Sequence, residues 1–399
     1  MLTFPDEVIY THEAVGESIK IRRRFCVIKI KSVEVLVYRY PLETIVQTSF
    51  GTMHDRPMVL VKLTDEDDYV GVGEVWCNFP AVGAEHRARL IDSVFTPLLT
   101  MEPFDSPASA FELLTRKTWV LGLQTGEFGP IAQCIAGIDI AFHDLTARRD
   151  ETPLWKYLGG VSDSVETYAS GINPTDAEKT AEAALKSGYR ALKLKIGFNP
   201  AHDIQNIKSL RTLLGENGQL MVDANQAWTV TEAQEMMQKI AAYNINWIEE
   251  PIYADRPDNE WHILKDCGNT PLAGGENIMG ENSFDHVIKA GYLSVIQPDL
   301  AKWGGLTKTV PVARKIIAEG KRFCPHYLGG GVGLLASAHA LAAVGGRGIL
   351  EVDINQNPLR TILVDAFFEP SSSTMQLGNS PGLGAEVDFK ALSLSLIHI

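Results

Sequence analysis

Three acidic residues at the ends of successive strand-like segments constrain the fold of this chain more than any other feature. Asp223 lies in LMVDAN, Glu249 in INWIEEP and Glu276 in PLAGGEN, at intervals of 26 and 27 residues. Such an interval accommodates one strand, one helix and two short loops. Acids at the carboxyl ends of parallel strands would converge at the top of a β/α barrel, where such folds keep their active sites. Converging carboxylates repel one another unless a cation lies between them, and hard oxygen ligands without His or Cys favour Mg²⁺ over zinc.

From Val165 onward, short strand-like segments alternate with amphipathic helical ones. The eight candidate strands are VETYAS, ALKLKI, QLMVDAN, INWIEEP, PLAGGEN, LSVIQPDL, RFCPHYL and GILEVD. This alternation predicts parallel strands joined by right-handed crossovers, and eight units suffice to close a barrel of the TIM type. The alternative is an open doubly wound sheet, which should carry a glycine-rich phosphate loop after its first strand. YASGINP lacks the G-x-G-x-x-G pattern, so the barrel is favoured.

The remaining sequence predicts three further regions around this barrel of residues 151–355. Residues 1–28 show no clear pattern and are interpreted as an N-terminal extension. Residues 29–150 predict an α+β domain, because alternating apolar residues broken by Asp-Glu-Asp-Asp indicate an antiparallel hairpin, and helical periodicity follows from about Ala84 to Arg149. Residues 356–399 are rich in turn residues and are predicted to return to the first domain.

Composition excludes several classes of partner. The formal net charge of −13 over 399 residues argues against nucleic acid or an anionic membrane. The five cysteines include no C-x-x-C pair, so they indicate neither a disulfide framework nor a zinc knuckle, and a reducing cytoplasm is the expected location. The first residues do not resemble a signal peptide, and the longest apolar stretch, around GLLASAHALAAV, is too short to span a bilayer.

Two lysines precede the acidic residues. In ALKLKIGF, Lys193 and Lys195 are two positions apart on a strand, so their side chains point to the same face. Leu192, Leu194 and Ile196 would face the helices, which places the lysines inside the barrel. Taken alone, the two lysines more readily indicate the solvent-exposed end of a strand. Beside Mg²⁺ in a restricted site, however, a lysine can have a lowered pKa and act as a base.

Later strand ends carry an Asp, a His and a Glu. Asp299 follows the sixth strand in VIQPDLAKWGG, and His326 lies on the seventh in RFCPHYL. Adjacent strand ends could bring these two within hydrogen-bonding distance, and the Asp would then orient the imidazole and raise its basicity. Glu351 ends the eighth strand in GILEVD. Its carboxyl group could donate to a substrate oxygen, although a structural helix cap is an equal alternative.

This arrangement predicts a specific chemistry. Lys195 and His326 would lie on opposite sides of the barrel mouth, so a substrate carboxylate bound to the metal would have a potential base on each face of its α-carbon. The α-proton is too weakly acidic for a lone side chain to remove. The metal and Lys193 must therefore stabilise the enediolate that forms.

The ordered set K-x-K, D-x-N, E-E-P, G-E-N, D-x-x-K, P-H and L-E-V-D resembles the enolase superfamily, in the mandelate racemase and muconate lactonizing enzyme family and its mandelate racemase subgroup. AGIDIAFHDLTARRDETPLWKYLGG resembles the family's linker into the barrel, and PGLGAEVD its C-terminal return. The resemblance covers nearly the whole chain from about residue 29. It implies a modified, enolase-like (β/α) barrel with an N-terminal α+β capping domain, a Mg²⁺ cofactor, a small carboxylate substrate and a homo-oligomer.

The resemblance also implies a role for each matching residue. It implies that the metal ligands are Asp223, Glu249 and Glu276, that the base on one face is Lys195, and that the opposite acid or base is His326 paired with Asp299. It further implies that the groups near the substrate carboxylate are Lys193 and Glu351, with a polar substrate contact from Asn225. Capping-domain loops near residues 47–56 and 76–83 would close over the barrel and set specificity. Their candidate substrate contacts are His54, Arg56, Trp76 and Asn78.

The same site supports more than one reaction. Many members of the family resemble acid-sugar dehydratases, so dehydration of a sugar acid to a 2-keto-3-deoxy acid is favoured. Racemisation or epimerisation of an α-hydroxy acid is the alternative, because two opposed groups can also remove and return a proton. A non-catalytic barrel that serves as a binding or scaffold protein is a remote third possibility. It predicts missing ligands or acid and base groups, and none is missing from the sequence.

Overall fold

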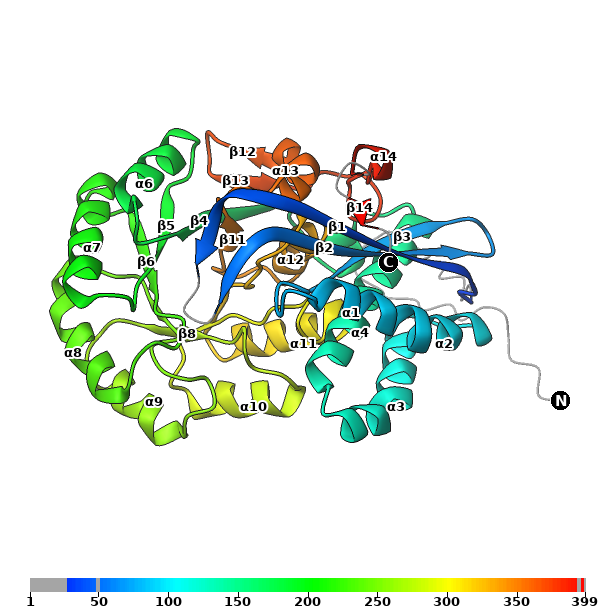
Figure 1. Ribbon diagram of the computed structural model, residues 1–399, viewed down its shortest axis with the longest axis horizontal. Coiled ribbons are helices and arrows are strands. Elements are labelled where there is room, and N and C mark those ends of the chain that lie inside the picture. Colours follow the sequence, from blue (N-terminus) through cyan, green and yellow to red (C-terminus); the bar gives the residue numbers. More distant parts are fainter. Residues whose placement is uncertain (1–26, 48–50, 393–395, 398–399) are drawn as a thin grey trace, which may run out of the picture.

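The computed structural model describes residues 27–47, 51–392 and 396–397. In Figure 1 the N-terminal part, coloured blue to cyan, lies beside a larger β/α part, coloured green to orange. The predicted N-terminal extension lies almost entirely outside the described residues. The domain boundaries expected from the sequence stay predictions, because strand and helix bounds alone do not define folding units.

An antiparallel sheet begins the N-terminal part. Its strands are β1 (Ile30–Gln47), β2 (Thr52–Asp65) and β3 (Val70–Val75), and the short β14 (Leu396–Ile397) pairs with β1. The predicted hairpin is confirmed, since β2 pairs antiparallel with β3. Asp65 shapes its turn: Oδ1 accepts hydrogen bonds from the backbone N–H groups of Asp67 at 3.0 Å and Tyr69 at 2.9 Å. A short acidic segment therefore makes the chain reverse.

Four α-helices follow this sheet, as the periodicity from Ala84 to Arg149 predicted. They are α1 (Gly83–Leu90), α2 (Thr96–Met101), α3 (Pro107–Thr125) and α4 (Phe128–Arg149). The long helix α4 packs directly on β3 because of two glycines in V-G-V-G. A Cβ atom at Gly71 would lie 2.1 Å from the carbonyl oxygen of Ala141, and one at Gly73 would lie 1.9 Å from that of Gly137. Only glycine permits such a close approach of helix and strand.

All eight predicted strands are present, and they pair with one another in parallel, while β4 also pairs antiparallel with the later strand β13 (Thr374–Gln376). The eight are β4 (Ser164–Ile172), β5 (Ala191–Lys195), β6 (Gln219–Asp223), β7 (Ile248–Glu249), β8 (Leu272–Gly274), β9 (Val295–Ile296), β10 (Arg322–Phe323) and β11 (Leu350–Asp353). They pair in chain order from β4 to β10, and β11 returns to pair with β4. This is the order of a β/α barrel.

Helices alternate with these strands on the outside. They are α6 (Ala177–Lys186), α7 (Pro200–Leu214), α8 (Val230–Ile240), α9 (Asp258–Lys265), α10 (Glu281–Ala290), α11 (Gly305–Ala318), α12 (Gly331–Val344) and α13 (Pro358–Val364). The short helix α5 (Leu154–Tyr157) precedes the barrel, and β12 (Phe368–Glu369), β13 (Thr374–Gln376) and α14 (Phe389–Leu392) follow it. Figure 1 shows α6 to α10 wrapping around one side of the barrel.

The interior of the barrel is a single packed layer. One buried side chain comes from each strand or its immediate neighbour, namely Tyr168, Ala191, Met221, Trp247, Ala273, Val295, Cys324 and Ile349. The described residues of β10 and β11 form no ladder with each other. Their backbones nevertheless meet, because a Cβ atom at Gly348 would lie 2.0 Å from the carbonyl oxygen of Phe323. The eight strands thus enclose one core, and among the described residues only β10 and β11 meet without ladder hydrogen bonds.

Buried carboxylates of the N-terminal domain fix it onto the barrel. Glu74 on β3 accepts hydrogen bonds from the backbone N–H groups of Gly330 and Gly333 at the start of α12. Asp139 on α4 accepts hydrogen bonds from Leu306 at 2.7 Å and Thr307 at 2.9 Å, at the start of α11. A carboxylate at a helix N-terminus satisfies N–H groups that lack partners within the helix and interacts favourably with the helix dipole. These bonds fix the position of the capping domain over the barrel.

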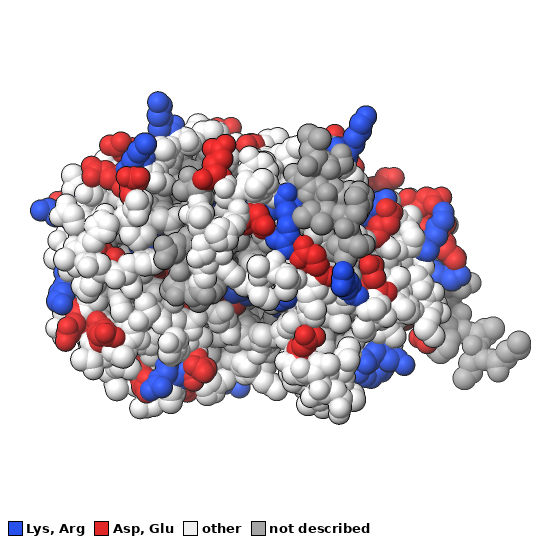
Figure 2. Space-filling model, in the orientation of Figure 1, with Lys and Arg blue, Asp and Glu red and all other residues white. Residues whose placement is uncertain are grey.

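The surface carries charges of both signs. Figure 2 shows Lys and Arg side chains interspersed with Asp and Glu side chains on the face that it displays. Among the described residues, no helix is both long and apolar enough to cross a membrane. The long apolar helix α12 is instead covered by protein, since every residue from Gly331 to Ala343 is buried.

His339 makes the packing of α12 sensitive to pH. Its Nδ1 atom accepts a hydrogen bond from the Trp155 N–H at 2.9 Å, and its Nε2 atom lies 3.2 Å from the carbonyl oxygen of Leu383. The ring is therefore neutral and carries its proton on Nε2. Burial lowers the pKa of His339 from 6.5 to about 4, against an opposing effect of the Leu383 carbonyl.

We expect the folded protein to lose stability as the pH falls from about 7 toward 5. The unfolded chain binds a proton on His339 near its ordinary pKa, whereas the folded chain binds it only near the lowered pKa. This difference removes roughly 2 kcal/mol from the free energy of unfolding at about pH 5. The measurement is the thermal unfolding midpoint of the wild type and of His339→Gln across this pH range.

The glutamine variant is the matched control, because its amide keeps one donor and one acceptor but does not titrate. Its midpoint relative to the wild type should rise as the pH falls. A difference between the two proteins that does not change with pH would contradict this account of His339.

Candidate active site

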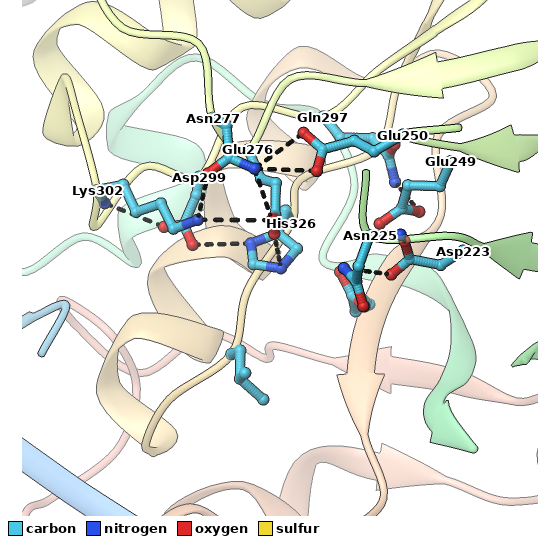
Figure 3. Close-up of polar contacts among 12 residues, drawn as sticks. Asp223, Asn225, Glu249, Glu250, Glu276, Asn277, Gln297, Asp299, Lys302 and His326 are labelled. Atoms are coloured by element: carbon cyan, nitrogen blue, oxygen red, sulfur yellow. Dashed lines mark hydrogen bonds and ion pairs between the residues drawn. The ribbon is translucent and has the colours of Figure 1, made fainter. Parts of the chain in front are cut away.

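The residues singled out in the barrel gather at the carboxyl ends of its strands. Lys193 and Lys195 lie on β5, Asp223 on β6, Glu249 on β7 and Glu351 on β11, while Glu276, Asp299 and His326 follow β8, β9 and β10. Figure 3 shows Asp223, Asn225 and Glu249 on one side of the site and His326 with Asp299 on the other. Seven strands of a parallel sheet thus bring side chains far apart in the sequence to one end of the barrel.

Lys193 is a buried cation between two carboxylates. Its Nζ atom lies 2.6 Å from Glu249 Oε1 and 2.7 Å from Glu351 Oε1, and the side chain is 1% exposed. Burial lowers the pKa of Lys193, but the two glutamates outweigh this effect and hold the pKa well above its usual range. Ser170 donates a further hydrogen bond to Glu351. In this arrangement the two glutamates hold Lys193 as a positive charge.

Lys195 belongs to a second, more accessible cluster. Its Nζ atom donates to Asp223 Oδ2 at 2.7 Å and to Asn225 Oδ1 at 2.6 Å, and its side chain is 23% exposed. Asn225 has a left-handed backbone with φ of 44°, and its N–H donates to Asp223 Oδ1 at 2.8 Å. The D-x-N motif is thus a turn that aims Asp223 and Asn225 at the same lysine.

The lysine pKa differs from the sequence prediction. A lowered pKa was expected for a lysine acting as a base, whereas the pKa of Lys195 is raised here. Burial lowers it, but the negative charge of Asp223 has the larger combined influence. The prediction presupposed a cation that neutralises Asp223, and the lysine pKa depends on that charge.

Glu249 is held by two residues that the sequence did not single out. Its Oε2 atom accepts hydrogen bonds from Gln297 Nε2 at 2.7 Å and from Trp247 Nε1 at 3.2 Å. Burial raises the pKa of Glu249 to about 7, against the lowering effect of Lys193. One signal for Gln297 was available: it precedes Asp299 by two positions in VIQPD, so the two side chains share a face of the chain.

His326 lies between two carboxylates. Its Nδ1 atom is 2.8 Å from Asp299 Oδ2, and its Nε2 atom pairs with Glu276 (Figure 3). Burial lowers the pKa of His326, but Glu276 and the more distant Glu351 outweigh it and hold the pKa well above its usual range. The structure therefore brings Asp299 and His326 into hydrogen-bonding contact, as adjacent strand ends had suggested. Their catalytic roles stay predictions.

A polar network that the sequence analysis left unassigned surrounds Glu276. Asn277 Nδ2 donates to Glu250 Oε2 at 2.9 Å and to Glu276 Oε1 at 3.0 Å (Figure 3). Lys302 Nζ donates to Asn277 Oδ1 at 3.3 Å. Burial and the adjacent Glu276 raise the pKa of Glu250 to about 8. Each of these residues stands inside a motif already recognised, E-E-P, G-E-N or D-x-x-K, but without an assigned function.

The capping-domain candidates occupy different positions. The guanidinium of Arg56 is 2% exposed and donates to Asp353 on β11 at 3.0 Å, so it links the two domains. Asn78 donates to the carbonyl oxygen of Leu328 at 2.6 Å. Trp76 is partly buried, and its ring lies 5.0 Å from Lys302 Nζ. His54 is exposed and lines a cavity of about 320 Å³ that Asn78 also borders. Substrate contact by these four residues stays a prediction.

The three predicted metal ligands each contact a cation of the protein. Asp223 pairs with Lys195, Glu249 with Lys193, and Glu276 with His326. Within the described part of the chain, no three His, Cys, Asp or Glu side chains are arranged closely enough to hold a metal ion.

The chemistry of the donor set nevertheless fits Mg²⁺. Three carboxylates, with the amide oxygens of Asn225 and Asn277 nearby, are hard oxygen donors. The three carboxylates would have to turn from their protein cations toward one another to bind it. Metal binding by these residues therefore stays a prediction.

Comparison with known families decides the identity of this fold. Residues 29–159 match the family described as mandelate racemase / muconate lactonizing enzyme, N-terminal domain, and residues 176–391 match the enolase C-terminal domain-like family. The chain belongs to the mandelate racemase/muconate lactonizing enzyme family of the enolase superfamily. The family and the barrel fold predicted from the sequence are therefore confirmed.

Several members of this family are similar over nearly their whole length. A 3,6-anhydro-alpha-L-galactonate cycloisomerase from Streptomyces coelicolor is 31% identical and aligns over 91% of this chain and 98% of its own. A mandelate racemase/muconate lactonizing enzyme from Bordetella bronchiseptica RB50 has a solved structure that is 50% identical, with a TM-score of 0.88, covering 93% of this chain and 100% of its own.

A racemase from Streptomyces coelicolor A3(2), solved with bound magnesium, is 27% identical, with a TM-score of 0.81, and covers 92% of this chain and 100% of its own. Other relatives are named as dehydratases of sugar acids, and others as epimerases or racemases. Magnesium is thus typical of the family.

We expect Gln297→Leu to weaken Mg²⁺ binding about tenfold. The side chain of Gln297 orients Glu249 through a buried hydrogen bond, and loss of such an outer partner commonly reduces metal affinity by about 10- to 100-fold. Isothermal titration of the substrate-free protein with Mg²⁺ measures this affinity directly.

Gln376→Leu is the matched control, because Gln376 is exposed on β13 and bonds Ser164 and Thr374 at the start of β4 and on β13. It should bind Mg²⁺ like the wild type. Equal affinities of the Gln297 variant and this control would show that the contact with Glu249 does not support the metal site.

Proposed function

We propose that this protein is a Mg²⁺-dependent enzyme that removes the proton α to the carboxylate of a sugar acid and expels the β-hydroxyl group as water. The product would be a 2-keto-3-deoxy acid. One observation carries the proposal: Lys195 on β5 and the Asp299–His326 pair after β9 and β10 lie on opposite sides of the barrel mouth, with the three carboxylates on the arc between them. Relatives named as arabinonate and L-talarate/galactarate dehydratases support this substrate class.

Asp223, Glu249 and Glu276 would hold the metal. Bound there, Mg²⁺ supplies a Lewis acid that polarises the substrate carboxylate and makes the α-proton more acidic. Lys193 contributes a second, permanent positive charge, because Glu249 and Glu351 keep it protonated at 2.6 and 2.7 Å. Such a preorganised charge stabilises the negative oxygen that develops when the proton leaves.

Two residues would move the protons. Lys195, held by Asn225 at 2.6 Å, lies on one side of the substrate, and His326, oriented by Asp299 at 2.8 Å, lies on the other. One would take the proton from C2, and the electron pair of that C–H bond would move toward the carboxylate to give the enediolate. The enediolate would then re-form the carboxylate, while its electron pair makes the C2–C3 double bond of an enol and the C3–O bond breaks. The other donates a proton to the departing oxygen, which leaves as water. Tautomerisation of the enol then gives the keto acid.

Isomerisation is the second candidate. The same opposed pair could remove the proton on one face and return it on the other, which would racemise or epimerise an α-hydroxy acid. Relatives named as epimerases and racemases favour this alternative. Relatives named as cycloisomerases also favour an isomerase.

Relatives named as cycloisomerases, dehydratases and epimerases argue against a non-catalytic barrel. The expected homo-oligomer and cytoplasmic location stay predictions.

We expect a screen of sugar acids with Mg²⁺ in D₂O to give a 2-keto acid with solvent deuterium at C3, because the enol takes up a solvent proton there. NMR and a colour test for 2-keto acids measure the product. EDTA should stop turnover, and added Mg²⁺ should restore it. α-Proton exchange without keto acid would instead establish the isomerase. Full activity of a metal-stripped protein would contradict the metal site.

We expect His326→Asn to lower turnover at least about a thousandfold, because it removes a proton carrier. The variant should fold and bind Mg²⁺, since no predicted ligand changes. Steady-state kinetics and a Mg²⁺ titration measure the two effects.

His286→Asn is the matched control for this substitution. His286 is exposed on α10, where it pairs with Asp258 on α9, remote from the predicted proton carriers. This variant should turn over like the wild type. Unchanged turnover in the His326 variant would contradict a site with a proton carrier on each face.

A further inference from the structure

Lys302 lies where the capping domain meets the carboxylates of the barrel. It is in the loop between β9 and α11, and its side chain is 15% exposed. Its Nζ atom is 5.0 Å from the ring centre of Trp76, which directly follows β3 in the capping domain. The same atom is 3.7 Å from Glu276 Oε1 and 3.3 Å from Asn277 Oδ1. One ammonium group therefore lies over an aromatic ring of one domain and near a predicted metal ligand of the other.

The distances show which contacts hold the ammonium group. At 3.7 Å from Glu276, Lys302 is farther than a charge-assisted hydrogen bond, which is about 2.7 to 2.9 Å long. A cation within about 6 Å of an indole centre is attracted to the face of the ring, and partial burial strengthens this attraction. Trp76 and Asn277 thus hold the ammonium group of Lys302 at a distance at which it makes no hydrogen bond to Glu276.

The position of Trp76 is itself fixed by neighbouring residues of its domain. Two residues earlier, Glu74 binds the N-terminus of α12, and two residues later Asn78 donates to the Leu328 carbonyl at 2.6 Å. The ring above Lys302 is therefore part of a segment that the barrel holds on both sides.

We propose that Trp76 restrains Lys302 and so keeps Glu276 available to Mg²⁺. Without the indole, the ammonium group would move onto the carboxylate and compete with the metal ion for it. Lys302 is then a positioning residue, and the capping domain sets the metal affinity of the barrel through it. This inference rests on the metal site of the proposed function.

The test is a Mg²⁺ titration of the full, substrate-free chain by isothermal calorimetry. Trp76→Leu should weaken binding about three- to thirtyfold, the range expected for loss of a partly buried cation–π contact. Lys302→Met should tighten binding at least about threefold, because it removes a competing positive charge. In the Lys302→Met background, Trp76→Leu should have no effect on Mg²⁺ affinity.

Two further variants serve as controls. Lys308 is 5.8 Å from the ring centre of Phe111 in the capping domain, but it pairs with Glu112 and Glu281, neither of which is a predicted ligand. Lys308→Met should therefore bind Mg²⁺ like the wild type. Trp76→Phe keeps an aromatic face and should stay within about threefold of the wild type. If Trp76→Leu does not fold, Trp76→Phe serves as the test in its place. A loss of Mg²⁺ affinity greater than about threefold in Trp76→Phe would overturn the proposal.

The outcomes separate this inference from the proposed function. Weaker binding in Lys302→Met, or an equal effect of Trp76→Leu in both backgrounds, would overturn the role of Lys302 and leave the metal site standing. Failure of the wild type to bind Mg²⁺ would instead reject the proposed function itself.

Discussion

Repulsion among the carboxylates at the barrel mouth is the constraint on which the rest of the site depends. Asp223, Glu249 and Glu276 lie at the ends of neighbouring strands, in surroundings where burial disfavours their charge. Each contacts a different cation of the protein, and these are Lys195, Lys193 and His326. Because each buried carboxylate needs a neighbouring positive charge, two lysines and a histidine lie next to the three acids. This arrangement also defines the competition that a metal ion would face at the predicted ligands.

The capping domain acts on this site through buried charges. Glu74 and Asp139 bind the N-termini of α12 and α11, which are the helices that follow β10 and β9. Arg56 reaches Asp353 on β11 by a buried ion pair, in which loss of one partner would leave an uncompensated charge. The position of the cap is therefore set by contacts to the elements that carry His326, Asp299 and Glu351.

Much of the site could be predicted from the sequence, because strand alternation decides which side chains point inward. The contact between Asp299 and His326 followed from two adjacent strand ends. Gln297, Asn277 and Lys302 were not assigned, although Asn277 and Lys302 stand within recognised motifs and Gln297 lies two positions before one. An uncharged side chain such as Gln297 gives no signal of function until the structure shows that it donates to Glu249.

The sequence by itself determined the order of the strands, the end of the barrel that carries the acids and the family. These properties follow from local periodicity and from motifs of a few residues. Only the tertiary structure decided which partner each charge has. Arg56, a candidate for substrate contact, pairs with Asp353, which is 297 residues away. Local patterns fix the direction of a side chain. Pairing across such a separation depends on how the two domains pack, because a buried charge needs an opposite charge or a hydrogen-bond donor nearby.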